Sequence, residues 1–361
     1  MNHSFRVGII GATGYVGQRF VTLLDGHPWF KVTQLAASER SAGLTYEKAC
    51  ENRWKMTQPI PEDLRNQIMQ STDHLEDWIE SVDFVFCAVD MKKDDVKRLE
   101  ERIAKTETPV VSNNSANRMI ADVPMIVPEI NPDHTALIEQ QRHRLGTRRG
   151  FIIVKPNCSI QSYVPALTPL MKFEPVQIIV STYQAVSGAG KTLSDWPEML
   201  DNMIPYIGGE EEKSEHEPLK IWGTLSQTGI LMAAEPVISA QCYRVAVQEG
   251  HTAAVSVRFR RKPGEQEILD CWSSFRGYAA QAGLPSAPDP FLIYRSEQDR
   301  PQPSLDSMAG NGMAITIGRL RPDPVLDWKF TCLSSNTIRG AAGGGILSAE
   351  LLVQQGYLSP R

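Results

Sequence analysis

The sequence lacks the features that mark membrane-spanning, secreted and nucleic-acid-binding proteins. None of its apolar runs approaches the roughly 20 residues that a membrane-spanning helix needs, and the opening MNHSFRVGIIG has no basic segment followed by a long apolar stretch. The net charge is −5, whereas proteins that bind nucleic acid or acidic membranes usually carry a basic face. We therefore expect a cytoplasmic protein that acts on small molecules.

Paired cysteine spacing is also missing. The six cysteines are scattered along the 361 residues, without the close pairs that mark zinc sites or the dense framework of small disulfide-bonded domains. We expect reduced thiols and no metal site.

Strands and helices alternate through the first part of the chain. Short β-branched runs at 5–10, 30–37, 82–90 and 109–113 are separated by segments of helical periodicity, of which 16–24 and 92–106 are the clearest. Such alternation predicts a doubly wound parallel sheet of the α/β class. The polar stretch 44–75 is expected to be a helix-containing insertion.

The pattern changes after residue 158. Longer strands are predicted at 176–188, 242–247 and 251–262, and the last of these alternates as a sheet with one wet face does. A second, α+β domain is therefore expected. The final segment 334–358 predicts a glycine-rich turn and an apolar helix that packs back on the first domain.

The stretch GATGYVG follows the first strand and opens the first helix. Gly11, Gly14 and Gly17 have the every-third-residue spacing of a dinucleotide turn, displaced from the usual G-x-G-x-x-G. Such a turn lets the backbone approach a pyrophosphate, and the helix directs its N-terminus at the anion. A tight strand-to-helix turn without a ligand is the alternative interpretation.

The turn after the second strand bears on the choice of cofactor. An NAD enzyme usually has an acidic residue there for the ribose hydroxyls, but this chain has Ser38, Glu39, Arg40 and Ser41. An arginine flanked by hydroxyls suits the 2′-phosphate of NADP. An ordinary polar turn remains the alternative.

Cys158 lies in KPNCS, where an apolar strand ends and a helix-like stretch begins. The N–H groups and partial positive charge of a helix N-terminus lower the pKa of a thiol, which suits a nucleophile. The alternative is a buried cysteine that only fills space.

A cysteine nucleophile needs a proton donor or acceptor, and histidine is the usual one. His251 stands at the start of a strand in RVAVQEGHT, seven residues after Arg244. A histidine satisfied by its neighbours at a strand start is the alternative. Surface positions are expected for the histidines at the N-terminus, at helix ends and in polar stretches, namely His3, His27, His74, His134 and His143.

Taken together, these pieces resemble the aspartate-semialdehyde dehydrogenase family over nearly the whole length, and most closely its archaeal and fungal-type branch. The matching motifs, in order, are GATGYVG, SNNSANRM, VPEIN, PNCS, YQAVSGAG, GEEEK, RVAVQEGHT and NTIRGAAGGG. Lys191, which follows SGAG, departs from the uncharged or aromatic residue expected there.

The resemblance implies reduction of L-4-aspartyl phosphate by NADPH to L-aspartate 4-semialdehyde, with release of phosphate. It implies an NADP-binding Rossmann-type domain at 1–157, completed by 335–361, and a catalytic and dimerisation domain at 158–334, in a homodimer or homotetramer. The implied catalytic residues are Cys158 as nucleophile, Gln184 as the residue that orients the thioacyl intermediate and His251 as acid/base. The implied substrate residues are Arg244 for the carboxylate, Glu210 for the ammonium group, and Lys213, Arg118 and Asn157 for the phosphate. The implied cofactor residues are Gly11, Thr13, Gly14, Tyr15, Val16, Ser38, Arg40, Ser41, Ser187, Gly188 and Asn336.

Three other functions remain open at this point. N-acetylglutamyl-phosphate reductase and malonyl-CoA reductase use related chemistry, but an acylated amine needs no counter-charge at Glu210 and a CoA thioester needs no phosphate clamp. A homologue that binds NADP without turnover is the third, although Cys158, Gln184, Arg244 and His251 are all present.

Overall fold

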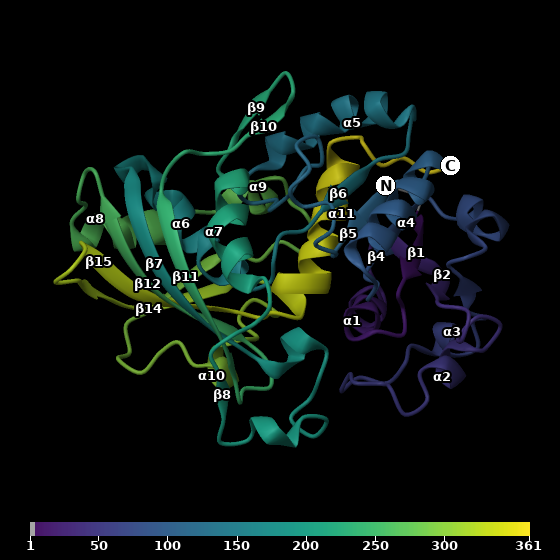
Figure 1. The fold of residues 1–361 in the computed structure, drawn as a ribbon, viewed down its shortest axis with the longest axis horizontal. Coiled ribbons are helices and arrows are strands. Elements are labelled where there is room, and N and C mark those ends of the chain that lie inside the picture. Colours follow the sequence, from purple (N-terminus) through teal and green to yellow (C-terminus); the bar gives the residue numbers. More distant parts are fainter. Residues whose placement is uncertain (1–3) are drawn as a thin grey trace.

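The computed structural model describes residues 4–361 and contains two large sheets (Figure 1). The first is a six-stranded parallel sheet in the order β3-β2-β1-β4-β5-β6. Its strands are β1 (Phe5–Ile10), β2 (Phe30–Ala37), β3 (Gln70–Ser71), β4 (Phe84–Cys87), β5 (Val110–Ser112) and β6 (Ile152–Val154). The strand order reverses at β1, and the crevice at such a point is where doubly wound sheets bind ligands. The predicted parallel sheet is confirmed.

The helices of this region follow the predicted periodicity. In α4, Val96, Leu99 and Ile103 recur at helical spacing and are buried, while the acidic and basic residues between them mostly face outward. The helices and helical turns are α1 (Tyr15–Leu23), α2 (Tyr46–Ala49), α3 (Glu62–Arg65), η1 (Leu75–Asp77), η2 (Ile79–Ser81), α4 (Lys93–Lys105), η3 (Pro132–Ala136) and α5 (Leu137–Leu145). Within residues 4–361, no helix is long and apolar enough to cross a membrane.

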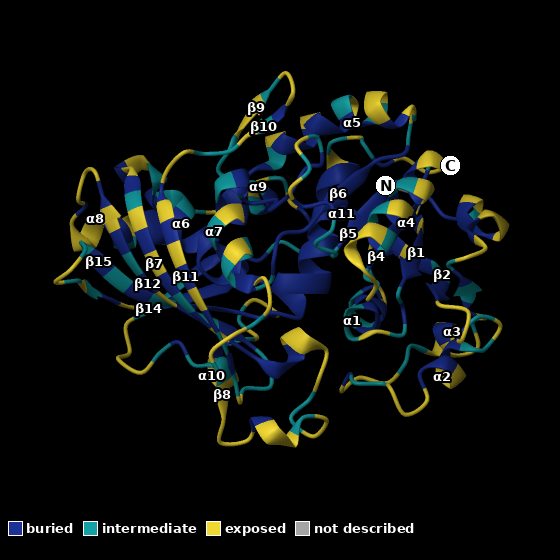
Figure 2. Cartoon of the chain, viewed as in Figure 1, coloured by how far each residue is buried: buried dark blue, intermediate teal, exposed yellow. Residues whose placement is uncertain are grey.

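The second sheet is mixed, with seven strands in the order β13-β14-β15-β12-β7-β11-β8. Its strands are β7 (Pro175–Gln184), β8 (Met203–Ile204), β11 (Val237–Val245), β12 (His251–Phe259), β13 (Leu292–Arg295), β14 (Ile315–Pro322) and β15 (Trp328–Ser334), and β9 (Thr224–Ser226) and β10 (Gly229–Leu231) form a separate hairpin. Along β12, Val255 and Val257 are buried while Ala254 and Arg258 are exposed, as predicted (Figure 2). The α+β character of this region is confirmed.

The continuous helix expected after Cys158 does not form. The segment is divided into η4 (Ile160–Ser162), α6 (Val164–Leu167) and η5 (Thr168–Phe173). Pro165 and Pro169 each lie at the start of one of these pieces, because proline has no N–H to donate to the preceding turn. The remaining helices and helical turns are η6 (Val186–Ala189), η7 (Pro197–Met199), α7 (Glu210–Ile221), α8 (Glu265–Ser274), α9 (Gly277–Gln281), α10 (Pro303–Asp306), η8 (Ile338–Ala342) and α11 (Gly343–Gln354).

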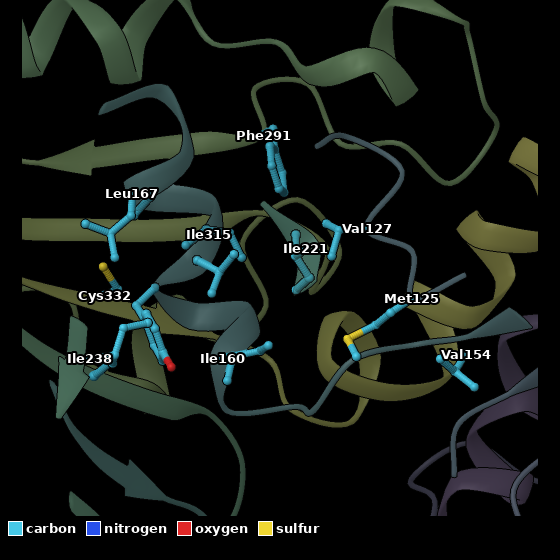
Figure 3. Packing of buried hydrophobic residues seen from close by; sticks show 14 of the residues in the cluster. Met125, Val127, Val154, Ile160, Leu167, Ile221, Ile238, Phe291, Ile315 and Cys332 are labelled. Atoms are coloured by element: carbon cyan, nitrogen blue, oxygen red, sulfur yellow. The ribbon is translucent and has the colours of Figure 1, made fainter. Parts of the chain in front are cut away.

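One apolar cluster connects the two sheets (Figure 3). Met125 and Val154 belong to the side of the first sheet, while Ile315 and Cys332 come from the second sheet, and Ile160 lies between them. The chain that leaves β6 therefore enters the core of the second sheet at once. This path places residues 155–159 at the junction of the two sheets.

The C-terminal segment returns to the first sheet as predicted, and α11 is almost entirely buried beside it (Figures 1 and 2). The glycines at 343–345, however, lie inside the helix and do not form the expected turn. A Cβ atom on Gly345 would lie 2.9 Å from the ring of Phe20, so the glycine permits close approach of the helix.

Two of the histidines expected at the surface have covered side chains instead, with 5% of the His27 side chain exposed and His134 fully buried. His27 lies 2.9 Å from the carboxylate of Glu350 in α11, and the ring of His134 is placed between Asn131 and the carbonyl of Gly223. Each side chain joins segments far apart in the sequence, which local polarity does not reveal. His3 lies outside the described residues.

Candidate active site

Three strands of the second sheet bring polar residues to one edge. β7 and β11 are parallel, so Gln184 and Arg244 at their C-terminal ends are paired across the strands. β12 runs antiparallel to β7, and its first residue, His251, therefore begins at the same edge. Cys158 reaches this edge from the chain that leaves β6.

Cys158 and His251 meet at this edge. The distance from Cys158 Sγ to His251 Nε2 is 3.5 Å. His251 Nδ1 accepts the N–H of Ala185 at 3.1 Å, so the proton of the neutral ring is placed on Nε2, facing the sulfur. Burial, aided by the nearby charge of Arg244, lowers the pKa of His251 to about 3. The imidazole is therefore neutral at pH 7.

The thiol of Cys158 does not have the lowered pKa that the sequence predicted. Burial raises its pKa, and the charge of Glu210 acts in the same direction, against the cations Lys155, Arg118 and Arg244. A long helix, which would supply a dipole, does not follow the cysteine. The prediction was wrong because desolvation and a buried carboxylate outweigh a single helical turn.

Glu210, the first residue of α7, is the centre of the polar network. Its carboxylate accepts hydrogen bonds from Asn157 Nδ2 at 2.9 and 3.0 Å, from Gln184 Nε2 at 3.2 Å and from Lys213 Nζ at 2.7 Å. Burial by itself would raise the pKa of Glu210, but these donors and the charge of Lys213 hold it below its usual range. A charged carboxylate therefore lies beside Cys158.

Arg244 and the turn at 187–190 also lie next to His251. Arg244 Nη1 donates to the carbonyl of Ala185 at 2.7 Å. A Cβ atom on Gly188 would be 2.8 Å from that nitrogen and 3.0 Å from His251 Nε2. Only glycine lets the backbone pass so close to both side chains.

Residues that fit a dinucleotide lie at the C-terminal end of β1. Gly11 has a φ of +85°, and a Cβ atom there would be 2.3 Å from the carbonyl oxygen of Ala88 after β4. A Cβ atom on Gly17 would be 2.2 Å from the carbonyl oxygen of Gly11. The turn is thus a narrow cradle at the start of α1, where phosphates bind in this fold. It is formed by the predicted residues Gly11, Thr13, Gly14, Tyr15 and Val16.

The turn at 187–190 connects this cradle to the Cys158–His251 pair. A Cβ atom on Gly190 would lie 3.9 Å from Cβ of Tyr15 in the cradle. Asn336 Nδ2 donates to Ser187 Oγ at 2.8 Å, and its Oδ1 accepts the N–H of Gly250, next to His251, at 2.8 Å. The predicted cofactor residues from three parts of the chain are therefore close together.

The predicted 2′-phosphate residues follow β2. Ser38 and Arg40 are exposed, whereas Ser41 is buried. Glu39 is hydrogen-bonded to Ser71 Oγ in β3, which holds its carboxylate beside that strand. Ser38, Glu39 and Arg40 are thus all exposed, and Glu39 is the one whose side chain has a partner in β3.

Comparison with known proteins identifies the family. Residues 6–138 match the family model described as semialdehyde dehydrogenase, NAD binding domain, and residues 167–339 match semialdehyde dehydrogenase, dimerisation domain. The aspartate-semialdehyde dehydrogenase of Archaeoglobus fulgidus is 41% identical over 97% of this chain and 98% of its own. That of Saccharomyces cerevisiae is 39% identical over 97% of this chain and 98% of its own. The chain belongs to the aspartate-semialdehyde dehydrogenase family.

A solved structure agrees with this family. The aspartate-semialdehyde dehydrogenase of Candida albicans with NADP has a TM-score of 0.88 at 38% identity, and the alignment covers 99% of this chain and 100% of that one. The archaeal and fungal members are thus similar to this chain along its full length, as its motifs predicted. The structure of aspartate semialdehyde dehydrogenase II from Vibrio cholerae, with a TM-score of 0.73 and 24% identity, shares the fold.

Several residues around the site of this family member were not found from the sequence. Lys155 is buried three residues before Cys158, and Glu217 is buried in α7 two turns after Glu210. A Cβ atom on Gly340 would be 2.8 Å from Cβ of Cys158. The spacing of seven residues between the two glutamates was the one available signal, since it places both on one helix face.

The unusual Lys191 has a local partner. Its Nζ lies 4.2 Å from the centre of the Trp196 ring, as a cation–π contact requires. The lysine therefore packs within the segment that follows the turn at 187–190. Its charge is directed at the aromatic ring.

Proposed function

We propose that this protein catalyses the NADPH-dependent reductive dephosphorylation of L-4-aspartyl phosphate to L-aspartate 4-semialdehyde. The observation that carries the proposal is the contact of 3.5 Å between Cys158 Sγ and His251 Nε2, with Glu210 and Arg244 beside it. A thiol, a neutral imidazole and two opposite charges form the set that acyl transfer from a zwitterionic amino acid requires. The family supports the same reaction.

The chemistry begins at sulfur. The thiolate of Cys158 attacks the acyl carbon, the bond from that carbon to the phosphate oxygen breaks, and phosphate leaves with the electron pair. A thioester results, and its carbonyl is electrophilic enough to accept a hydride. The carbon–sulfur bond then breaks, which releases the semialdehyde and returns the thiolate of Cys158. NADPH, when bound, supplies that hydride. His251 donates a hydrogen bond from Nε2 to the sulfur, which favours the thiolate, and is the proton donor nearest to the reacting centre.

Charged side chains around the pair orient the substrate. Arg244 suits a bidentate grip on the α-carboxylate, and Glu210 suits the ammonium group. Lys213 and Arg118 supply positive charge for the phosphate, with the amide of Asn157 as a further donor. Gln184 lies within hydrogen-bond distance of Glu210, where its amide orients the thioacyl group.

Cofactor residues are assigned by the part of NADP that each would hold. The cradle Gly11, Thr13, Gly14, Tyr15 and Val16 would hold the pyrophosphate, because its glycines leave room for backbone approach. Ser38, Arg40 and Ser41 would meet the 2′-phosphate, and the exposure of Ser38 and Arg40 supports them better than the burial of Ser41. Ser187, Gly188 and Asn336 would hold the nicotinamide end, beside Cys158.

Self-association is proposed through the open face of the second sheet. Ile179, Tyr183 and Val237 on β7 and β11 are exposed to 50%, 37% and 68%, and this face alternates with a buried one (Figure 2). The matched dimerisation-domain model covers these strands. We propose a homodimer, or a homotetramer built from it, with nucleotide-binding residues at 1–157 and 335–361 and the catalytic and dimerisation domain at 158–334. Analytical sedimentation of Ile179→Asp and of the wild type tests this proposal, since a charge on this face should weaken self-association if the face forms the interface.

The test of the reaction is its reverse. Wild type and Cys158→Ala are mixed with L-aspartate 4-semialdehyde, NADP⁺ and phosphate, and the absorbance of reduced nicotinamide is followed. Phosphate-dependent reduction by the wild type alone supports both the reaction and the nucleophile. If the wild type binds NADP but does not reduce it, the proposal is contradicted. Assays with N-acetylated and CoA substrates would then distinguish the two related reductases from a homologue without turnover.

A further inference from the structure

A buried carboxylate without an assigned role lies behind the phosphate side of the site. Glu217 in α7 is 2% exposed. Its Oε1 lies 3.0 Å from Arg118 Nη1, and its Oε2 accepts the backbone N–H of Asn157 at 2.6 Å. One side chain thus contacts both the arginine and the residue before Cys158.

The guanidinium of Arg118 is held at its two terminal nitrogens. Nη1 faces Glu217, and Nη2 donates to the carbonyl of Asn113 at 3.0 Å. Nε is buried and has no hydrogen-bond partner within residues 4–361. A guanidinium has five N–H donors, so these two hydrogen bonds fix the orientation of the group and leave three N–H groups of Arg118 without a partner among residues 4–361.

The backbone that carries Arg118 is held by the same helix. Lys220, three residues after Glu217, donates from Nζ to the carbonyls of Arg118, Ile120 and Val123 at 2.6, 2.6 and 2.8 Å. Glu210, seven residues before Glu217, binds the side chain of Asn157. One face of α7 therefore contacts both the side chain and the backbone of Arg118. The same face contacts both the side chain and the backbone of Asn157.

We infer that Glu217 is a positioning residue that sets the direction of Arg118 toward the phosphate and the place of Asn157 beside Cys158. The inference rests on the proposed function, since it assumes that Arg118 meets phosphate. A second anion near a phosphate site weakens phosphate binding by charge alone. The carboxylate therefore acts through the geometry that it imposes, because its charge by itself opposes the phosphate.

The first variant is Glu217→Gln. Glutamine keeps the volume but offers one acceptor oxygen, and its NH₂ group faces one of the two N–H donors, so one contact is lost. In the reverse reaction, KM for phosphate is expected to rise about tenfold, which corresponds to about 1.4 kcal/mol. KM for the semialdehyde should change less than about twofold, because Arg244 and Glu210 hold that part of the substrate. Glu212→Gln, an exposed residue of the same helix, is the matched control and should leave both KM values unchanged.

A double-mutant cycle identifies the route. If Glu217 acts in part through Arg118, Glu217→Gln should raise KM for phosphate by a smaller factor in an Arg118→Lys background than in the wild type, and the remaining rise is due to the contact with Asn157. An unchanged effect in that background, equal changes in both KM values, or a lower KM for phosphate would overturn the inference alone. An inactive wild type would overturn the proposed function and the inference with it. If Glu217→Gln fails to bind NADP, Glu217→Asp takes its place, since it keeps the charge but withdraws the carboxylate, and the same selective rise is expected.

Discussion

Replacement of Lys155 by methionine should make the protein more stable at low pH and its nucleophile less reactive. Lys155 is 3% exposed, and its Nζ donates to the carbonyl of Pro156. Within residues 4–361 no carboxylate lies within 4.0 Å of this ammonium group. Burial lowers the pKa of Lys155 from 10.5 to about 7. At about 1.36 kcal/mol for each pH unit, this difference corresponds to about 5 kcal/mol.

The sign of the pH dependence follows from proton binding. Between pH 7 and 10.5 the unfolded chain holds this proton more tightly than the folded protein, so the free energy of unfolding rises with pH. The free-energy cost of burying the protonated Lys155 is fully present below pH 7 and disappears above pH 10.5. Methionine has similar length and no charge. The free energy of unfolding of Lys155→Met should therefore be higher than that of the wild type by up to about 5 kcal/mol at pH 6 and by about 2 kcal/mol at pH 9.

Denaturant unfolding of both proteins at the two pH values measures this difference. Lys31→Met, at an exposed position of β2, is the control and should show little change at either pH. A stability difference between Lys155→Met and the wild type that does not narrow as the pH rises would refute the reasoning. Such a result would mean that folding does not lower the pKa of Lys155, because the ammonium group is solvated in the folded protein and keeps its proton over this pH range.

Lys155→Met should also make the thiol of Cys158 less reactive. Lys155 is the foremost of the cations that lower the pKa of Cys158 against its burial. Below pH 7, where Lys155 is protonated, its removal should lower the thiolate fraction of Cys158, so alkylation by iodoacetamide at pH 6 should slow by about tenfold if the pKa of Cys158 rises by about one. Alkylation as fast as in the wild type would show that the thiol does not sense this charge.

Three further variants test single contacts. Gly340→Ala places a Cβ atom 2.8 Å from Cβ of Cys158, so turnover should fall at least about tenfold while NADP binding is kept; full turnover would contradict the close approach. Glu129→Gln disrupts the buried pair with Arg339, whose distances are 2.6 and 2.7 Å, and should lower the free energy of urea unfolding by about 3–5 kcal/mol; a loss below about 1 kcal/mol would show that the arginine finds other partners. Lys220→Met leaves three carbonyls without their donor and should lower the melting temperature at pH 7, whereas an unchanged value would show that water replaces the ammonium group.

Local pattern was sufficient for most of the secondary structure. The buried run of β4 and the helical periodicity of α4 depend on neighbours within a few residues, and both formed where predicted. The order of motifs along the chain also indicated the family and the residues that would meet. The family resemblance, and not spacing, implied that Cys158 and His251 share one site, and the structure places them 3.5 Å apart although 93 residues separate them.

Errors occurred where a residue depends on distant partners. The three glycines at 343–345 were predicted to form a turn, but they lie in a helix. Their lack of a side chain serves close packing, since a Cβ atom on Gly345 would lie 2.9 Å from Phe20 and one on Gly344 would lie 3.2 Å from Lys155. The local sequence predicted a solvated His27, but the structure places Glu350, from the other end of the chain, beside it. Neither contact has a signal in the neighbouring sequence.

The sequence by itself determined most of the elements and the family, because periodicity and motif order are properties of the chain, and it predicted the reacting groups. The tertiary structure decided the electrostatics of those groups. Cys158 has a raised pKa and His251 a lowered one because folding removes water and brings Glu210 and Arg244 close. Desolvation and charge act through space, so the protonation states at the site follow from the packing of segments that are far apart in the chain.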